Sequence, residues 1–201
     1  MDRCKIKVLH FLYIFRMFKD KSFTWLTDYY YGLSNEVSRQ EEKQSGIINH
    51  FVKLSHQLTP VIDNIFIGNA CNSSSYYELT ENRIRTVVNV TEEIPNYFEE
   101  EFDYFKAPIR DTAEDSLQPY FKNILDYIYK QQEKYPDSNI LIHCYMGSSR
   151  SAAIVVLYLI SKHNYTLENA VNFLREKRDI VNINTIFIQN LKEFVAQQKK
   201  E

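Results

Sequence analysis

The sequence predicts an α/β fold in which a central, mostly parallel, twisted sheet of about five strands is flanked by helices. Two observations support this prediction. From about residue 59 onward, short runs rich in β-branched residues alternate with longer stretches of helical periodicity. The apolar run 139–142 is also followed by a polar loop and then by the longer apolar run 152–160, which indicates a buried strand leading into a buried helix.

The first half of this region contains three segments with strand character and one with helix character. Residues 61–68 predict two short strands joined at an Asp-Asn turn, and residues 85–90 predict a third. Residues 104–109 predict another strand, in which Pro108 indicates a sheet edge or a strand end. A helix is expected from Leu117 to Gln131, with one face formed by Phe121, Leu125, Ile128 and Tyr129.

The second half predicts one strand and three helices. A strand at 139–142 leads through the polar loop to a helix at 151–162. Thr166 is a good N-cap for a helix at 167–177, because its hydroxyl can accept a hydrogen bond from a backbone N–H of the first turn. The face of a last helix is marked by Phe187, Leu191, Phe194 and Val195.

The chain of 201 residues divides by composition into two parts. Residues 1–55 are expected to form a helical N-terminal extension of unassigned role, and residues 56–201 a single α/β domain. The apolar run 8–15 is too short to span a bilayer, so no integral membrane segment is expected. The alternatives for this run are a packed helix, an interfacial membrane helix and a docking segment, and an exposed apolar helix here would favour a homodimer.

Charge and cysteine content limit the classes of partner. The net charge of −2 provides no general attraction for nucleic acid. The three cysteines, Cys4, Cys71 and Cys144, do not form the pattern of a disulfide framework, which predicts an intracellular, cytoplasmic protein; a nuclear or virion-associated location is also compatible. A single His-Cys pair does not complete a zinc site, so no metal and no cofactor are expected.

The most informative segment lies in the loop between the strand at 139–142 and the helix at 151–162. Its backbone N–H groups should converge where the positive end of the following helix points, which predicts an anion site with a thiol at its floor. A cysteine and an arginine are separated there by five residues, in the sequence His143-Cys144-Tyr145-Met146-Gly147-Ser148-Ser149-Arg150-Ser151.

Each residue type in this loop suits attack on a tetrahedral oxyanion such as phosphate. The helix N-terminus and Arg150 favour the thiolate form of Cys144, which is the nucleophilic form. The planar guanidinium of Arg150 matches two phosphate oxygens. Gly147 permits a tight curve of the backbone, Ser151 can donate a hydrogen bond to the departing thiolate, and His143 is expected to bond to the loop and tune the thiol.

The loop resembles the signature His-Cys-x-x-Gly-x-x-Arg-Ser of the dual-specificity subclass of cysteine-dependent protein tyrosine phosphatases. The resemblance extends over about residues 57–197. Residues 88–96 are similar to the segment after an early strand in the MAP-kinase-phosphatase-like and atypical branch. Asn184 resembles the residue at which the last helix of the family begins. Ile183 stands where many members have proline. The family resemblance implies that the phosphate is bound by Tyr145, Met146, Gly147, Ser148, Ser149 and Arg150.

The resemblance also implies a general acid, and Asp111 is the candidate. It follows the strand at 104–109 and begins a polar loop, where a carboxyl group could protonate a leaving oxygen. Glu114 and Asp115 are its rivals, although each is by default a solvated loop carboxylate, and Asp115-Ser116 could simply cap the helix at Leu117.

The expected function is therefore hydrolysis of phosphotyrosine and phosphoserine or phosphothreonine in a phosphoprotein, through a phosphocysteine intermediate. A phosphatase acting on lipid or RNA phosphates is an alternative, although the loop has no lysine to meet additional phosphates. A second alternative is a phosphatase-like module that binds phosphoproteins without turnover. Cys144, Arg150 and Asp111 are all present, which favours the enzyme.

Overall fold

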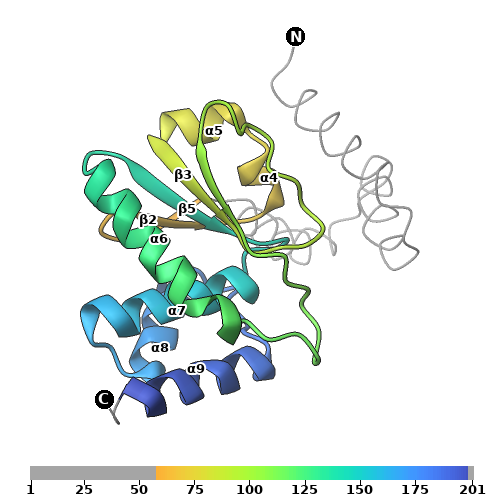
Figure 1. Ribbon diagram of the computed structural model, residues 1–201, viewed down its shortest axis with the longest axis vertical. Helices are drawn as coiled ribbons and strands as arrows, with labels where there is room; N and C mark the ends of the chain where they lie inside the picture. Colours follow the sequence, from red (N-terminus) through yellow and green to blue (C-terminus); the bar gives the residue numbers. More distant parts are fainter. Residues whose placement is uncertain (1–57, 199–201) are drawn as a thin grey trace, which may run out of the picture. The chain divides into compact units, whose positions relative to one another are not determined.

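The computed structural model describes residues 58–198. The predicted N-terminal extension, its apolar helix and the homodimer contact assigned to it lie outside these residues. Five strands and the helices between them follow one another along the described chain (Figure 1). In order they are β1 Thr59–Ile62, β2 Ile65–Gly68, α4 Ala70–Ser73, α5 Tyr76–Glu81, β3 Ile84–Asn89, β4 Asp103–Lys106, the 3₁₀ turn η2 Gln118–Tyr120, α6 Phe121–Lys134, β5 Asn139–His143, α7 Arg150–His163, α8 Leu167–Lys177 and α9 Thr185–Gln198.

The strands form one sheet in the order β1-β2-β5-β3-β4. The hairpin β1–β2 is antiparallel, whereas β2, β5, β3 and β4 are parallel to their neighbours. This confirms the predicted mostly parallel sheet. The last strand in the sequence, β5, lies in the centre, so the carboxyl ends of β2, β5 and β3 meet at one edge. In open parallel sheets, ligands bind at such an edge.

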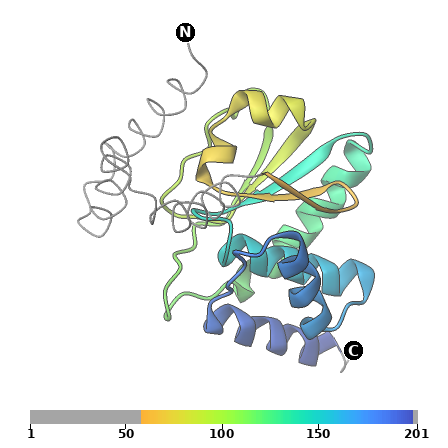
Figure 2. The same cartoon turned by 180° about the vertical axis from the view of Figure 1, so that it is seen from behind.

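The central strand β5 is buried on both faces, as its continuous apolar sequence predicts. Ile140 and Ile142 belong to one core cluster, whereas Leu141 between them belongs to a second. The larger cluster includes side chains of α6, α7, α8 and α9, and the smaller includes Leu79 of α5. Figure 1 shows these four helices on one side of the sheet and α5 on the other. Figure 2 shows the same layers from behind. Side-chain alternation along the strand therefore anchors the start of the next loop from both sides.

Helix α7 is buried around its whole circumference from Arg150 to Ile160. A helix that is apolar on every side packs inside a protein rather than on its surface. It contacts β2 and β5 on one side and α8 and α9 on the other. The predicted buried helix is thus confirmed, and its position fixes the N-terminal turn against the end of β5.

Most predicted elements are confirmed, and two of them differ from prediction by three or more residues at one end. The strand predicted at 104–109 ends at Lys106, because Pro108 has no N–H group to bond to a neighbouring strand. This strand, β4, lies at the edge of the sheet, as Pro108 indicates. The helix predicted from Leu117 begins as the 3₁₀ turn and extends to Lys134. The predicted Thr166 cap is present, with the Asn169 N–H 3.2 Å from its hydroxyl.

Two short helices, α4 and α5, fall in a stretch for which the periodicity makes no prediction. With four and six residues, they are too short to show a helical period. Their N-cap residues are nevertheless of types that favour a helix start. Asn69 accepts a hydrogen bond from the Asn72 N–H, and Ser75 accepts one from the Glu78 N–H. Helix α4 matters for the site because it begins next to the loop after β5.

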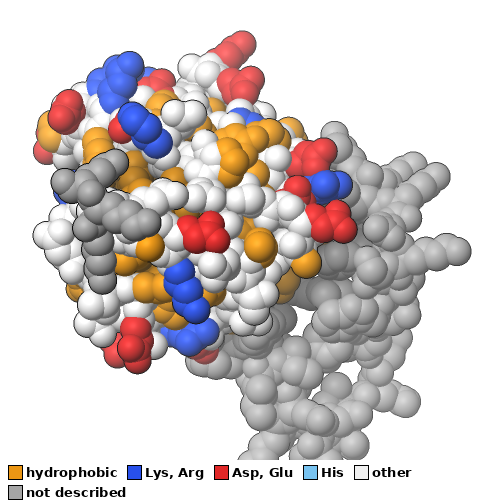
Figure 3. Space-filling model, turned by 60° about the horizontal axis from the view of Figure 1, so that its bottom comes forward, with side chains coloured by type: hydrophobic (Ala, Val, Ile, Leu, Met, Phe, Trp, Pro, Cys, Tyr) orange, Lys and Arg blue, Asp and Glu red, His pale blue; other side chains and the backbone are white. Residues whose placement is uncertain are grey.

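None of the helices among residues 58–198 is long and apolar enough to cross a membrane. Figure 3 shows one face of the molecule, on which basic and acidic side chains are interspersed among small apolar patches. On this face no extended patch of one charge is present among the coloured residues.

Candidate active site

The loop 144–149 begins where three parallel strands end side by side. Gly68 at the end of β2 and Asn89 at the end of β3 are both in register with His143 at the end of β5. The chain beyond both neighbours also bonds to this segment: the Val90 N–H donates to the His143 carbonyl at 2.9 Å, and the Ala70 N–H to the Tyr145 carbonyl at 3.1 Å. The loop is therefore fixed by backbone contacts on both sides.

Cys144 lies at the floor of this loop, with only 1% of its surface exposed. The backbone N–H of Gly147 and the hydroxyl of Ser151 both donate to its Sγ atom, each at 3.2 Å. Two donors aimed at one sulfur stabilise its anionic form more than its neutral form, because the anion is the stronger acceptor. Three of the predicted residues are therefore assembled as expected.

The N-terminus of α7 faces the same space. Its N-cap residue Ser149 makes no side-chain capping bond. Instead its hydroxyl donates to Asp111 and accepts from the Asn184 N–H, each at 3.1 Å. The N–H groups at the start of a helix have no partner within the helix, so a terminus without a side-chain cap can donate to an anion.

Gly147 is the loop residue for which a side chain is excluded. Its φ angle is +73°, in the left-handed region that glycine tolerates. A Cβ atom here would lie 2.5 Å from the Gly68 carbonyl oxygen and 2.8 Å from a nitrogen of Arg178. The glycine predicted from the motif is thus required by its φ angle and by lack of space.

Arg150 is 5% exposed and is held from one side by Glu93. Its two terminal nitrogens contact the two carboxylate oxygens at 2.9 and 2.8 Å, which is a bidentate pair. The first of these nitrogens also donates to the Ile109 carbonyl at 2.9 Å. Its Nε atom is buried and has no hydrogen-bond partner among the described residues. The Nε–H group can therefore donate to an oxygen of a bound oxyanion.

The electrostatics of this pair keep both members charged. Burial raises the pKa of Glu93, but hydrogen bonds from Arg150 outweigh burial and the net pKa is lowered. Burial likewise lowers the pKa of Arg150, and the bond to Glu93 reverses this so that the net pKa is raised. Glu93 is the functional residue for which the sequence showed no role, because it lies 57 residues from its partner.

His143 is fully buried, and its Nδ1 atom lies 3.3 Å from the Cys144 carbonyl oxygen. Burial lowers its pKa to about 3, so the imidazole is neutral at physiological pH. The contact with the first loop peptide agrees with the predicted bonding to the loop. The predicted tuning of the thiol stays a prediction.

Asp111 lies next to the loop, as the acid candidate should. Its Oδ1 atom accepts from the Ser149 hydroxyl at 3.1 Å and from the Asn184 side-chain amide at 3.2 Å. Its Oδ2 atom lies 3.7 Å from Nε of Arg150. The Asn184 amide also donates to the Thr112 carbonyl at 3.1 Å, so one residue ahead of α9 holds this loop at two points.

The rival Asp115 is engaged elsewhere. Its carboxylate accepts from the Thr112 hydroxyl at 2.8 Å and from Arg110 at 3.1 Å, and these bonds lower its pKa. A carboxylate held in its ionised form is a poor proton donor. Asp115 does not cap the following turn either; Ser116 accepts from the Gln118 N–H at 3.2 Å. Glu114 is exposed.

The other loop residues contribute mainly backbone groups. The Ser148 carbonyl accepts from the Asn182 N–H at 2.9 Å. Met146 is 46% exposed, and Tyr145 is half-buried, with a pKa raised by burial. Their side chains are thus placed at the rim of the site, where they could contact a substrate.

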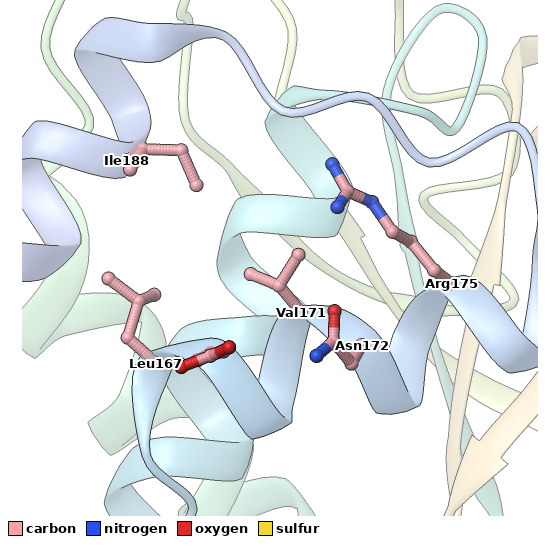
Figure 4. Close-up of a pocket in the computed structure, with 6 residues that line it drawn as sticks. Leu167, Val171, Asn172, Arg175 and Ile188 are labelled. Carbon is pink, nitrogen blue, oxygen red and sulfur yellow. The ribbon is translucent and has the colours of Figure 1, made fainter.

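A second hollow, of about 500 Å³, lies between α8 and α9 (Figure 4). Its walls carry apolar side chains from both helices together with the polar groups of α8. None of the catalytic candidates lines it. The lining residues are Leu167, Glu168, Val171, Asn172, Arg175 and Ile188.

The fold and the site together define a thiol-containing oxyanion-binding loop at the C-terminal edge of a parallel sheet, with a carboxylate beside it. Comparison with known proteins identifies the family. The family model for the dual specificity phosphatase catalytic domain matches residues 65–197. The chain therefore belongs to the dual specificity phosphatase family and carries its catalytic domain.

Individual relatives agree with this assignment. Mouse dual specificity protein phosphatase 14 is 31% identical over 70% of this chain and 70% of its own length. A Slingshot phosphatase homologue from Xenopus laevis is 34% identical over 65% of this chain but only 18% of its own length. The crystal structure of DUSP15 superposes with a TM-score of 0.64, at 26% identity, covering 69% of this chain and 87% of that one. This chain spans a fifth or less of the length of the Slingshot relatives that it matches.

Proposed function

We propose that this protein hydrolyses phosphotyrosine and phosphoserine or phosphothreonine in phosphoproteins through a phosphocysteine intermediate. The observation that carries the proposal is the pair of donors, Gly147 N–H and Ser151 hydroxyl, aimed at Sγ of the buried Cys144. A structural cysteine in an apolar core needs no such donors, whereas a nucleophilic thiolate does.

In the first step, Sγ of Cys144 attacks phosphorus in line with the leaving oxygen. The S–P bond forms, the P–O bond to the substrate breaks, and Asp111 gives its proton to the leaving oxygen. The Nε atom of Arg150, which has no hydrogen-bond partner among the described residues, and the loop amides bind the three equatorial oxygens, over which the negative charge is spread in the transition state.

In the second step, water attacks the phosphocysteine. Asp111, now ionised, takes a proton from the water as the O–P bond forms and the S–P bond breaks. The hydroxyl of Ser151, 3.2 Å from Sγ, donates a hydrogen bond to the departing thiolate. Inorganic phosphate and the resting enzyme result, so one carboxyl group serves as acid and then as base.

The test is a panel of phosphotyrosine, phosphoserine and phosphothreonine peptides, assayed with wild type and Cys144→Ser. We expect wild type to release phosphate and Cys144→Ser to lose at least about 10⁴-fold in kcat while it still binds the phosphopeptides. Cys144→Ser can also serve as a substrate trap. Cys71→Ser is the matched control, because Cys71 is the other free cysteine among the described residues.

Undiminished turnover by Cys144→Ser would overturn the mechanism. Phosphopeptide binding by wild type without any turnover would instead identify a binding module. The division of the chain into residues 1–55 and 56–201, a homodimer formed through the extension and a cytoplasmic location remain proposals. Light scattering with and without the extension tests the homodimer.

A further inference from the structure

A buried arginine, Arg178, lies behind the oxyanion loop and is not part of the mechanism above. It ends α8, is 2% exposed, and is separated from Cys144 by 34 positions in the sequence. Burying a guanidinium is costly unless its donors are satisfied. The direction in which its donors point therefore indicates what the residue does.

Two of these donors bind carbonyl groups of the loop itself. The Nε atom donates to the Gly147 carbonyl at 2.9 Å, and one terminal nitrogen donates to the Met146 carbonyl at 3.3 Å. The other terminal nitrogen donates to the Thr59 hydroxyl at 3.0 Å, which links the guanidinium to the start of β1. Arg178 thus holds two consecutive peptide groups from outside the loop.

The geometry of the peptide bond means that these contacts also set the direction of the loop N–H groups. In a trans peptide, the carbonyl of one residue and the N–H of the next point in opposite directions. Because the Met146 carbonyl points to Arg178, the Gly147 N–H points the other way, and it does so to Sγ of Cys144 at 3.2 Å. By the same rule, the Gly147 carbonyl held by Arg178 turns the Ser148 N–H away from Arg178.

The space around Gly147 leaves no room for a side chain. A Cβ atom on Gly147 would lie 2.8 Å from an Arg178 nitrogen and 2.5 Å from the Gly68 carbonyl oxygen. The guanidinium and the end of β2 therefore both pack closely against this part of the loop. Burial lowers the pKa of Arg178 to about 10, so the group stays positively charged at neutral pH.

We propose that Arg178 is a positioning residue of the oxyanion loop: it holds the Met146 and Gly147 carbonyls outward so that the Gly147 and Ser148 N–H groups point to the thiolate and the phosphoryl oxygens. In this role Arg178 acts through the loop backbone and not on the phosphoryl group itself. Arg150 binds the oxyanion from the inside, whereas Arg178 orients the amides from behind. The kinetic part of this inference rests on the proposed function, and the anion-binding part does not.

The test uses the full chain and compares Arg178→Met and Arg178→Lys with Arg175→Met. Arg175 lies one turn earlier on the same helix, is exposed, and borders the hollow in Figure 4, so its variant removes an equal charge from outside the site. Tungstate, a tetrahedral oxyanion, is the binding probe, measured by calorimetry. Hydrolysis of p-nitrophenyl phosphate gives kcat and KM.

We expect Arg178→Met to lower kcat/KM about 100-fold and to raise the Kd for tungstate at least about tenfold, because misdirected amide donors cost about as much as missing ones. Arg178→Lys should recover part of both losses, since one ammonium group can hold one carbonyl. Arg175→Met should stay within about twofold of wild type. The amide resonances of Gly147 and Ser148 should shift with tungstate in wild type and not in Arg178→Met.

A folded Arg178→Met or Arg178→Lys with a wild-type Kd for tungstate would overturn the inference. If Arg178→Met does not fold, Thr59→Val gives the second measurement, because it removes the hydroxyl that binds Arg178 and keeps the guanidinium. Unchanged tungstate binding and unchanged loop resonances in both Thr59→Val and Arg178→Lys would also overturn the inference. A wild type that binds tungstate but hydrolyses no phosphoester contradicts the proposed function instead, and the binding comparison still stands.

Discussion

The two loops that meet in the site are held by different kinds of contact. The oxyanion loop, residues 144–149, follows the central strand and is fixed by backbone bonds to the segments after β2 and β3. The acid loop around Asp111 follows the edge strand β4 and is exposed, with its carboxylate held by side chains of Ser149 and Asn184. The first loop is part of the core, whereas the second is attached to it.

This difference matches the roles that the proposed mechanism gives to the two loops. A thiolate and its amide donors must be rigid, because their contribution depends on orientation that exists before the substrate binds. An acid must reach a leaving oxygen whose position varies with the substrate, so a few side-chain contacts at the surface suffice. Changes in the acid loop should therefore impair proton transfer, whereas changes around the oxyanion loop should also impair anion binding.

The largest difference between the loss of turnover and the loss of anion binding is expected for Asp111→Asn. Asparagine keeps the shape but supplies no acidic proton, so kcat on phenyl phosphate should fall by about 10²–10⁴-fold, with a much smaller loss on an activated fluorogenic aryl phosphate. Tungstate affinity should be unchanged within about twofold. Asp115→Asn is the matched control. Equal losses on both esters, or a larger loss in Asp115→Asn, would assign the acid elsewhere.

Glu93→Gln should affect both turnover and anion binding. It removes the carboxylate that holds the buried Arg150, so that the guanidinium loses its fixed orientation and its charge partner. We expect kcat/KM to fall about 10- to 100-fold and tungstate affinity to fall with it. Glu92→Gln changes the neighbouring exposed carboxylate, 3.6 Å from Arg110, and should change neither. Normal tungstate binding by Glu93→Gln would show that Arg150 is held sufficiently by the Ile109 carbonyl.

The smallest effect concerns stability at acidic pH. The pKa of His143 is lowered to about 3 by burial, whereas it is about 6.5 in the unfolded chain. The unfolded state therefore binds more protons between these values, and stability should decline as the pH falls below 6.5, by on the order of 1 kcal/mol per pH unit. Urea unfolding of wild type and His143→Asn between pH 7 and pH 5 measures this slope. Equal slopes for wild type and His143→Asn would show that His143 is not the source of this pH dependence.

Contiguous sequence was sufficient to predict the oxyanion loop. Its donors, its glycine and its arginine lie within a few positions of one another in the sequence. The apolar runs on either side show which strand precedes the loop and which helix follows it. Sequence was also sufficient to place Asp111 at the end of a strand beside the site. It ranked Asp111 above Asp115 from their positions relative to the strand and the next helix, but it could not show the bonds from Ser149 and Asn184 that hold Asp111 beside the loop.

Glu93 and Arg178 show where sequence reasoning stops. Their partners are 57 and about 31 residues away, and neither residue stands in a pattern that distinguishes it from an ordinary surface charge. Their contacts with Arg150 and with the loop arise because the sheet order places the end of β3 beside the end of β5, and because α8 ends next to the loop. Short helices such as α4 were missed for a simpler reason, since four residues carry no period.

The sequence by itself determined the α/β class, the order of the main elements and the residues of the oxyanion loop, because hydrophobic period and local spacing act over a few residues. Only the tertiary structure decided which groups of Arg150 are bound by Glu93 and which carboxylate lies beside the oxyanion loop. It also decided that a second arginine binds two carbonyl groups of this loop. These features depend on contacts between segments that the sheet brings together, and such contacts have no local signature in the chain.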